Sequence, residues 1–302
     1  MTRVFAAADI GSNTAHLLIA ASDGRLVTRV DNINEWIPLG ETVAREGFIP
    51  KDRADELVMA MKEFRRMAQA EAGGRLYVFG TEAMRSAKNG EDVIRRVEKD
   101  AGVRVDVITP RREAELAYRG VLLDASGLDL GAMIELGGGS AQVGSVVAGE
   151  LADEVSLPLG TGRVIAEAGL SNPCPPERRA AAEAYIAKEL KRSTITPTRS
   201  SVAASGGVAR GLWRALHPDG EKALSGPELE YMIWAASRLS EARLVSRFNV
   251  KPKRAGTLLP GAMVYLALMN QFGLERMAVS EFGVREGAIL EMANGLLEAG
   301  SK

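Results

Sequence analysis

A short turn motif occurs twice in this chain, at residues 9–14 and again 126 residues later at 135–140. Each copy begins with an acidic residue, has a glycine two positions later and ends with a hydroxyl side chain. Apolar runs precede and follow both copies, which is the pattern of two strands joined by a hairpin turn. The repeat therefore predicts two structural units of one design, each organised around its own hairpin.

Both turns have the composition of an anion-binding loop. Three consecutive glycines in the second turn let backbone N–H groups approach an oxygen ligand, and the serine that follows adds a hydroxyl donor. The alternative for either copy is a flexible hairpin turn without a ligand. The residues predicted to bind phosphate are Gly11, Ser12, Asn13 and Thr14 in the first turn and Gly137, Gly138, Gly139 and Ser140 in the second.

Each turn also carries a carboxylate at the end of the strand that leads into it. Asp9 and Glu135 stand where a carboxylate can bind Mg²⁺ directly or through water, and a cation would offset the repulsion between carboxylate and phosphate. The alternative is an acidic residue that caps its own loop. We predict Asp9 and Glu135 as metal ligands.

The order of apolar patterns along the chain indicates the fold class. Stretches with strand and helix periodicity alternate, which predicts an α/β layer fold, and the two hairpins require mixed sheets. A length of 302 residues is sufficient for two domains. Within this pattern, residues 40–47 are expected to form a loop and residues 228–248 a single long helix.

Composition excludes several classes of partner and site. The formal net charge of -1 gives no general attraction to nucleic acid or to acidic membranes, and no stretch is long and apolar enough for a membrane span. The single cysteine, Cys174, can form no intramolecular disulfide, and two histidines argue against a zinc site. The N-terminal stretch lacks the pattern of a secretory signal, so a cytoplasmic location is predicted.

Two further residues are candidates for catalysis. Glu113 lies in the first turn of a helix expected after Pro110, where a carboxylate can act as a general base that activates water. Arg85 follows the strand at residues 76–79, and ligands bind at the carboxyl ends of strands in open α/β sheets, so its guanidinium can pair with phosphate oxygens. The alternatives are a solvated charge cluster for Glu113 and a surface arginine for Arg85.

Five motifs, taken in order, resemble the exopolyphosphatase and guanosine pentaphosphate phosphatase (Ppx/GppA) family. They lie at residues 8–14, 81–85, 113–116, 135–140 and 284–287 and so span nearly the whole chain. The resemblance implies an α/β actin-like (ASKHA) fold, in which two related domains with mixed sheets flanked by helices surround a central cleft. The expected domains are residues 1–124 plus 284–302 and residues 125–283. The end of the chain soon after the closing helix suggests the short two-domain form of the family.

The resemblance also implies a reaction. Glu113 would activate the water that attacks the terminal phosphorus, Arg85 would contact phosphate, and the two turns would cradle the phosphates with the help of Mg²⁺, or of Mn²⁺ as the alternative ion. Arg163, in a stretch that looks like the family's second-domain loop, would line the phosphate channel. The expected activity is that of an exopolyphosphatase, which releases orthophosphate from inorganic polyphosphate.

Several alternatives stay open at the level of sequence. Guanosine pentaphosphate is a second substrate for the same chemistry, and a nucleotide-binding actin-like scaffold or sensor with little turnover is an alternative of another class. A sugar kinase is less well supported because no aspartate base is marked. The chain departs from the family at Glu135 and Gln142, where aspartate and glutamate are usual, which leaves the metal preference open. A homodimer is compatible with the sequence.

Overall fold

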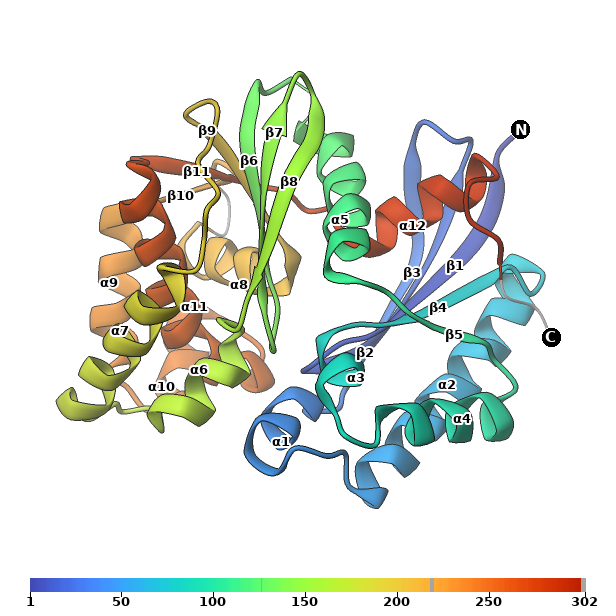
Figure 1. Cartoon of the computed structure of the whole chain (residues 1–302), viewed down its shortest axis with the longest axis horizontal. Coiled ribbons are helices and arrows are strands. Elements are labelled where there is room, and N and C mark those ends of the chain that lie inside the picture. Colours follow the sequence, from blue (N-terminus) through green and yellow to red (C-terminus); the bar gives the residue numbers. More distant parts are fainter. Residues whose placement is uncertain (126, 218–219, 300–302) are drawn as a thin grey trace. The chain divides into compact units, whose positions relative to one another are not determined.

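Two mixed β-sheets, each with its own helices, make up the computed structural model of the chain, which describes residues 1–125, 127–217 and 220–299 (Figure 1). The described residues fall into two compact units. Unit 1 contains Met1–Leu123 and the segment from Phe282 onward, and unit 2 contains Asp124–Glu281.

The sheet of unit 1 has the strand order β3-β2-β1-β4-β5. Strand β2 pairs antiparallel with β1 and β3, whereas β4 runs parallel to β1 and β5 runs parallel to β4. Its strands are β1 (Arg3–Ile10), β2 (Thr14–Ser22), β3 (Val27–Trp36), β4 (Leu76–Gly80) and β5 (Val105–Val107). Its helices are α1 (Leu39–Glu46), α2 (Lys51–Ala72), α3 (Glu82–Ser86), α4 (Gly90–Ala101), α5 (Pro110–Ala125) and α12 (Val284–Ala293).

Side-chain alternation along β1 determines which face of this sheet packs into the apolar core and which face holds Asp9. Ala6, Ala8 and Ile10 belong to one buried cluster with residues of α2 and α4. Because successive side chains of a strand point to opposite faces, Asp9 lies on the other face, where α12 packs against β1 and β2. The acidic residue of the first turn is thus kept out of the main apolar core.

The sheet of unit 2 has the strand order β10-β11-β9-β6-β7-β8 and repeats the same plan. Strand β7 pairs antiparallel with β6 and β8, and β9 runs parallel to β6. Its strands are β6 (Leu130–Leu136), β7 (Ala141–Val147), β8 (Glu150–Leu157), β9 (Ser201–Ser205), β10 (Ala223–Ser225) and β11 (Arg276–Val279). Its helices are α6 (Thr161–Ala168), α7 (Pro176–Leu190), α8 (Gly206–Leu216), α9 (Gly226–Ala236), α10 (Glu241–Phe248) and α11 (Pro252–Phe272).

The core of unit 2 shows the same division of faces. Ala132, Ile134 and Leu136 of β6 are fully buried in one cluster with residues from helices α6 to α11. Glu135, which lies between two of these residues, points to the opposite face of the sheet. Both acidic residues of the repeat therefore occupy equivalent places in their strands.

The structure contradicts two of the predictions of secondary structure. Residues 40–47 were expected to form a loop, but α1 covers most of them, because Leu39 and Val43 are buried in the core of unit 1 and Gly47 ends the helix in the left-handed conformation. The single helix expected at residues 228–248 is two helices, α9 and α10. The side-chain oxygen of Ser240 accepts a hydrogen bond from the Arg243 N–H and so starts α10 as an N-cap.

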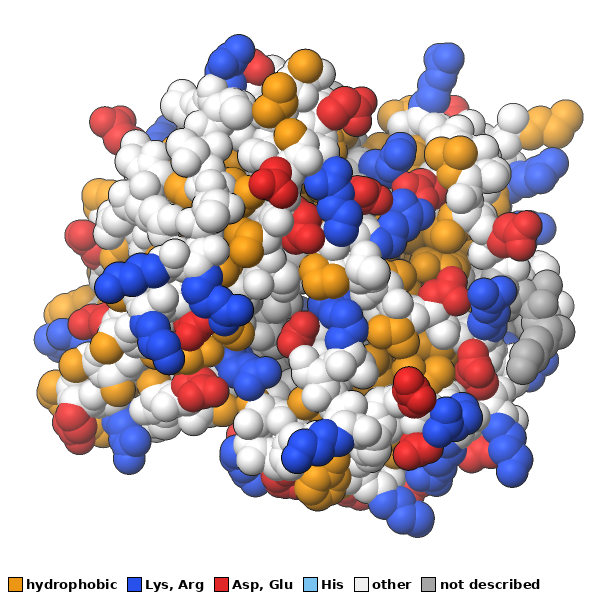
Figure 2. All heavy atoms as spheres, viewed as in Figure 1, with side chains coloured by type: hydrophobic (Ala, Val, Ile, Leu, Met, Phe, Trp, Pro, Cys, Tyr) orange, Lys and Arg blue, Asp and Glu red, His pale blue; other side chains and the backbone are white. Residues whose placement is uncertain are grey.

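The mixture of charged side chains on the surface agrees with the formal net charge of -1. On the face shown in Figure 2, Lys and Arg side chains are interspersed with Asp and Glu side chains, so neither sign of charge dominates that face. None of the described helices combines the length and the apolar character needed to cross a bilayer.

Candidate functional site

The first turn of the repeat is a tight hairpin connection held from one side by α1. The N–H of Gly11 donates to the carbonyl oxygen of Thr14 at 2.9 Å and closes the turn. The N–H of Gly40, in the first turn of α1, donates to the carbonyl oxygen of Ser12 at 2.6 Å. A Cβ atom on Gly40 would stand 2.5 Å from the Cβ of Ser12, so only glycine allows this close approach.

The second turn repeats these contacts position by position. The N–H of Gly137 donates to the carbonyl oxygen of Ser140 at 3.0 Å, and the N–H of Gly162, in α6, donates to the carbonyl oxygen of Gly138 at 2.8 Å. Gly138 and Ser12 are again 126 residues apart, so the repeat extends to the helix that supports each turn. A Cβ on Gly160 would lie 2.3 Å from the backbone of Gly138 and Gly139.

These supporting contacts use the carbonyl groups of the turns and leave N–H donors available. Among the described residues, the N–H groups of Ser12, Gly138 and Gly139 donate no hydrogen bond. Backbone donors gathered in a turn are suited to an oxyanion. The arrangement is therefore chemically able to bind phosphate oxygens, although the assignment of these residues to phosphate stays a prediction.

Strand register brings three loops of unit 1 to one edge of its sheet. Ile10 at the end of β1 pairs with Gly80 at the end of β4, which in turn pairs with Val107 at the end of β5. The first turn, α3 and the start of α5 all follow directly from these ends. This is the carboxyl edge, where ligands bind in open α/β sheets.

The two residues predicted for catalysis meet at this edge. The Arg85 guanidinium of α3 and the Glu113 carboxylate of α5 form an ion pair with 3.0 Å between Nη2 and Oε2. Nη1 of Arg85 donates to the carbonyl oxygen of Ile108 at 2.7 Å, and Nη2 also contacts Glu82 at 3.3 Å. The side chains of Arg85 and Glu113 are only 16% and 10% exposed, so a buried carboxylate is held in a fixed place.

The carboxylate of Asp9 has a partner that sequence reasoning did not assign. Arg285, at the start of α12, forms an ion pair with Asp9, and both side chains are largely buried. The next residue, Glu286, accepts from the N–H of Gly283 at 2.9 Å and pairs with Arg29 at 2.7 Å. The segment at 284–287 was noted as a motif, but nothing local to it indicated a contact with the first turn.

Close backbone contacts fix α12 against α5. A Cβ on Gly287 would lie 1.9 Å from the carbonyl oxygen of Leu116, and a Cβ on Gly120 would lie 2.1 Å from the carbonyl oxygen of Gly283. The buried carboxylate of Glu291 pairs with two arginines of α5, at 3.0 Å from Arg112 and 2.8 Å from Arg119. The helix that carries Arg285 is thereby fixed to the helix that carries Glu113.

The acidic residue of the second turn lies in a different environment. The carboxylate of Glu135 accepts a hydrogen bond from the hydroxyl of Ser205, its register partner on β9, and lies close against Gly206. The Tyr265 hydroxyl donates to the Ser205 carbonyl oxygen at 3.3 Å. Burial, with a further contribution from the charge of Glu135, raises the pKa of Tyr265 well above its usual value, so the phenol stays a donor.

Gln142 and Arg163 complete the predicted set in unit 2. The Gln142 amide is buried and donates to Ser140 Oγ at 3.2 Å and to Ser156 Oγ at 3.4 Å, so it positions the serine of the turn. The N–H of Arg163 donates to the carbonyl oxygen of Gly138 at 3.2 Å, and its side chain lies 3.9 Å from Glu167. Its Nε atom is buried and has no acceptor among the described residues.

A divalent cation fits the two acidic residues unequally. Mg²⁺ is usually held by one or two carboxylates together with water and phosphate oxygens. Glu135, a carboxylate at the end of β6 next to the second turn, fits that role, whereas the guanidinium of Arg285 already supplies positive charge at Asp9. No group of three or more His, Cys, Asp or Glu side chains suited to a metal ion occurs in the described part of the chain.

Solved structures share the fold of this chain. An exopolyphosphatase from Cytophaga hutchinsonii matches with a TM-score of 0.86 and 23% identity, over 99% of this chain and 100% of that one. A Ppx/GppA family member from Aquifex aeolicus matches with a TM-score of 0.79 and 24% identity, over 98% and 99% of the two chains. The α/β actin-like fold predicted from the sequence is confirmed, with mixed sheets of five and six strands.

Sequence comparison identifies the family. The Ppx/GppA phosphatase family matches residues 18–295, and the chain belongs to this family, as the sequence motifs predicted. Proteins named Exopolyphosphatase 1 from Mycobacterium leprae and Mycobacterium tuberculosis are each 30% identical over 296 residues. The alignments cover 93% of this chain and 87% and 86% of those proteins.

Proposed function

We propose that this protein is an exopolyphosphatase that releases orthophosphate from the end of an inorganic polyphosphate chain. The observation that carries the proposal is the Arg85–Glu113 pair, a buried carboxylate beside a guanidinium at the carboxyl edge of a sheet. Membership of a phosphatase family and the mycobacterial relatives named Exopolyphosphatase 1 support it.

Glu113 acts as the general base in this proposal. Its carboxylate takes a proton from the attacking water, whose oxygen forms a bond to the terminal phosphorus while the bond from phosphorus to the bridging oxygen breaks. The products are orthophosphate and a chain shortened by one phosphate. The contacts to Arg85 keep the carboxylate in one orientation, which is what a positioned base requires.

Arg85 has donors left for phosphate. A guanidinium carries five N–H groups, and among the described residues Arg85 uses only donors on Nη1 and Nη2, for Ile108, Glu82 and Glu113. Its Nε–H can therefore bond a phosphate oxygen without loss of the contact to Glu113. This gives Arg85 two roles, positioning the base and stabilising charge on the transferred group.

The two turns bind the phosphate chain in this proposal. The N–H groups and hydroxyls of residues 11–14 and 137–140 supply fixed donors for the negatively charged oxygens, and Arg163 adds a guanidinium beside the second turn. Glu135 would hold Mg²⁺, or Mn²⁺ as the alternative. When bound, the ion offsets phosphate charge as a Lewis acid. Asp9 stays a predicted ligand, with the pairing to Arg285 as its competitor.

Exchange of Glu113 for glutamine tests the base. Glu113→Gln should lower kcat for phosphate release by about 10²- to 10⁴-fold and leave polyphosphate binding largely intact. Glu115→Gln is the matched control, because Glu115 lies on the same helix, pairs with Arg111 and is 35% exposed. Near-normal phosphate release by the Glu113 variant would show that another group activates the water.

The substrate is decided by a comparison of three phosphate donors. Polyphosphate, guanosine pentaphosphate and ATP should be tested side by side, with Mg²⁺ and with Mn²⁺. Release chiefly from polyphosphate is expected. Faster release from guanosine pentaphosphate would reassign the protein to 5′-phosphohydrolysis of that nucleotide, and tight nucleotide binding with little release from any donor would favour a sensor.

A further inference from the structure

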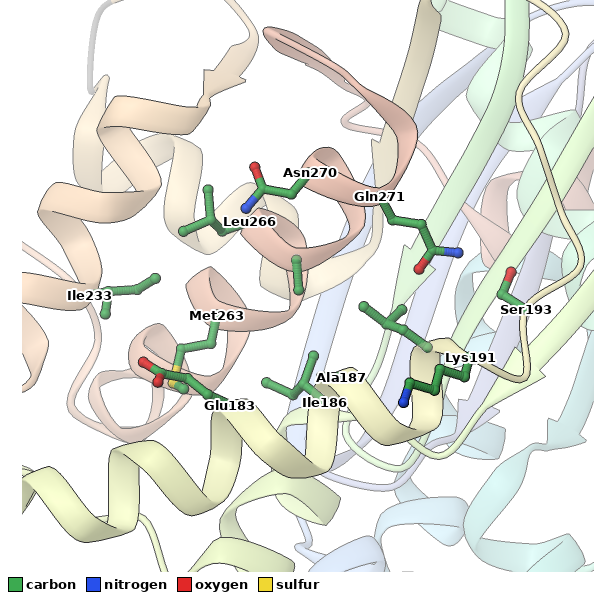
Figure 3. Close-up of a pocket in the computed structure, with 12 residues that line it drawn as sticks. Glu183, Ile186, Ala187, Lys191, Ser193, Ile233, Met263, Leu266, Asn270 and Gln271 are labelled. Atoms are coloured by element: carbon green, nitrogen blue, oxygen red, sulfur yellow. The ribbon is translucent and has the colours of Figure 1, made fainter.

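Unit 2 contains a pocket of about 650 Å³ between α7, α9 and α11 (Figure 3). None of the residues assigned above to catalysis, phosphate or metal lines it. Its volume lies within the range of small-molecule sites, roughly 300 to 1,000 Å³. The family motifs do not account for it.

The pocket is built from two matching helix faces. On α7 and on α11 the lining residues follow the spacing i, i+3, i+4, i+7 and i+8, which places each set on one face of its helix. An alanine stands at the centre of each set and leaves the space that a larger side chain would fill. The two sets are Glu183, Ile186, Ala187 and Leu190 on α7 with Lys191 directly after it, and Met263, Leu266, Ala267, Asn270 and Gln271 on α11.

The pocket has a mainly apolar part, which also contains the Glu183 carboxylate beside Met263 and paired with Arg179 at 3.3 Å, and a polar end. Ile186 and Met263 are buried and lie, with partly buried Leu266, along the apolar part. Figure 3 shows Lys191, Ser193 and Gln271 grouped at the other end. From Met263 to Gln271 the axis of α11 advances by about 12 Å.

The polar end opens toward a second hollow. This neighbour, of about 480 Å³, is lined mainly by the polar segment 193–200 and shares Ser193 and Gln271 with the first pocket. An occupant of the apolar part would therefore have its polar head group close to water.

Two exposed polar side chains without a partner among the described residues stand at the polar end. In the part of the chain that the structure describes, neither the Lys191 ammonium nor the Gln271 amide has a hydrogen-bond or ion-pair partner. Two nearby carbonyl groups, one at the end of each helix, are already used. Leu190 accepts from the Ser193 N–H at 3.0 Å, and Met269 accepts from the Leu274 N–H at 2.9 Å. The unpaired groups are thus one positive charge and one amide, which can both donate to a carboxylate.

We propose that this pocket binds an anionic amphiphile, a single hydrocarbon chain ending in a carboxylate. The chain lies along Ile186, Met263 and Leu266, and the carboxylate accepts hydrogen bonds from Lys191 and Gln271. Small-molecule sites usually bury the apolar part of the ligand and bind its charged group with a side chain of opposite charge. The proposal does not depend on the phosphatase reaction, because the two sites share no residue.

Titration calorimetry of the full chain with decanoate, below its micelle concentration, tests the head group. Decanol and decyltrimethylammonium, which have the same chain length, serve as neutral and cationic comparisons. Decanoate is expected to bind saturably and about tenfold more tightly than decanol. Lys191→Met should remove that difference, whereas Lys188→Met should keep it, because Lys188 is exposed and does not line the pocket. Equal affinity for the three ligands, or no saturable binding, overturns the proposal.

Filling the pocket with a larger side chain tests whether decanoate binds there. Ala267→Phe, and independently Ala187→Phe on the facing helix, should each abolish decanoate binding while circular dichroism and phosphate release stay unchanged. Two variants are used because Ala187 is exposed and tolerates a larger side chain even if partly buried Ala267 does not. Undiminished decanoate binding in both folded variants would place the ligand elsewhere and refute the assignment.

Discussion

Gly287→Ala is expected to destabilise the protein although alanine favours helices. The added Cβ would lie 1.9 Å from the carbonyl oxygen of Leu116, whereas real Cβ contacts are essentially never shorter than 3.0 Å. The two helices would have to separate by roughly the difference, about 1.1 Å. The second close contact, between Gly120 and Gly283, resists that movement. Overpacking of this kind costs about 3 kcal/mol at the upper end of its usual range.

The helix preference of alanine offsets part of that cost. It returns about 1 kcal/mol, which leaves a net loss of about 2 kcal/mol. A loss of that size lowers the midpoint of thermal unfolding by about 4–8 °C. Phosphate release should fall as well at temperatures where the variant is folded, because α5 carries Glu113 and α12 carries Arg285.

A glycine in open space provides the control. Gly211 lies within α8, and a Cβ there would meet nothing within 4 Å, so Gly211→Ala should raise the midpoint through helix preference alone. Circular dichroism on wild type and both variants gives the comparison. If Gly287→Ala unfolded at or above the wild-type midpoint, the close packing of α5 on α12 would not be a constraint.

Three further outcomes are expected. Glu135→Asp should preserve or improve the Mg²⁺ dependence of phosphate release, and a lost metal response in a magnesium titration would show that this site is tuned to the longer glutamate and differs from its relatives. Arg85→Lys should lower kcat far more than it changes KM. An ammonium lacks the planar set of donors with which the guanidinium bonds Ile108 and Glu113 at the same time. Glu228→Gln should destabilise α9 at neutral pH. Burial opposes ionisation of Glu228, but hydrogen bonds from Ser225 and the charge of His217 outweigh it and lower its pKa, so the stabilisation is lost as pH falls through that lowered pKa. Urea unfolding at pH 7 and at pH 3 checks this, and an equal difference at both would refute it.

The hairpins were predictable because their signals are local. Strand alternation, the glycines and the hydroxyl side chains all lie within a few residues of each turn, and the constant spacing identifies the second copy. The break between α9 and α10 was missed because apolar periodicity continues on both sides of Ser237–Ser240. Its signal was present in the sequence, since Ser240 stands at an N-cap followed by Glu241 in the first turn.

The supports of the site could not be derived from local pattern. Gly40 supports the first turn only because the chain returns after β3, and the partner of Asp9 is 276 residues away. The pairing of Glu291 with Arg112 and Arg119 also joins residues that are remote in sequence. Charged residues on a helix face look solvated until the tertiary structure shows which of them is covered. Arg85 and Glu113 were identified separately, whereas their direct contact required the register of β1, β4 and β5.

The repeat also shows where its two copies differ. The same hydrogen bonds close both turns and attach both to a following helix, so each turn presents backbone donors in the same way. The acidic residues differ, because Asp9 is paired with the guanidinium of Arg285, whereas Glu135 accepts from the neutral hydroxyl of Ser205. The two predicted metal ligands therefore differ in these partners, a guanidinium for Asp9 and a serine hydroxyl for Glu135. In the proposed function a cation held by Glu135 would offset the repulsion between that carboxylate and phosphate, and the magnesium titration of the Glu135 variant tests this role.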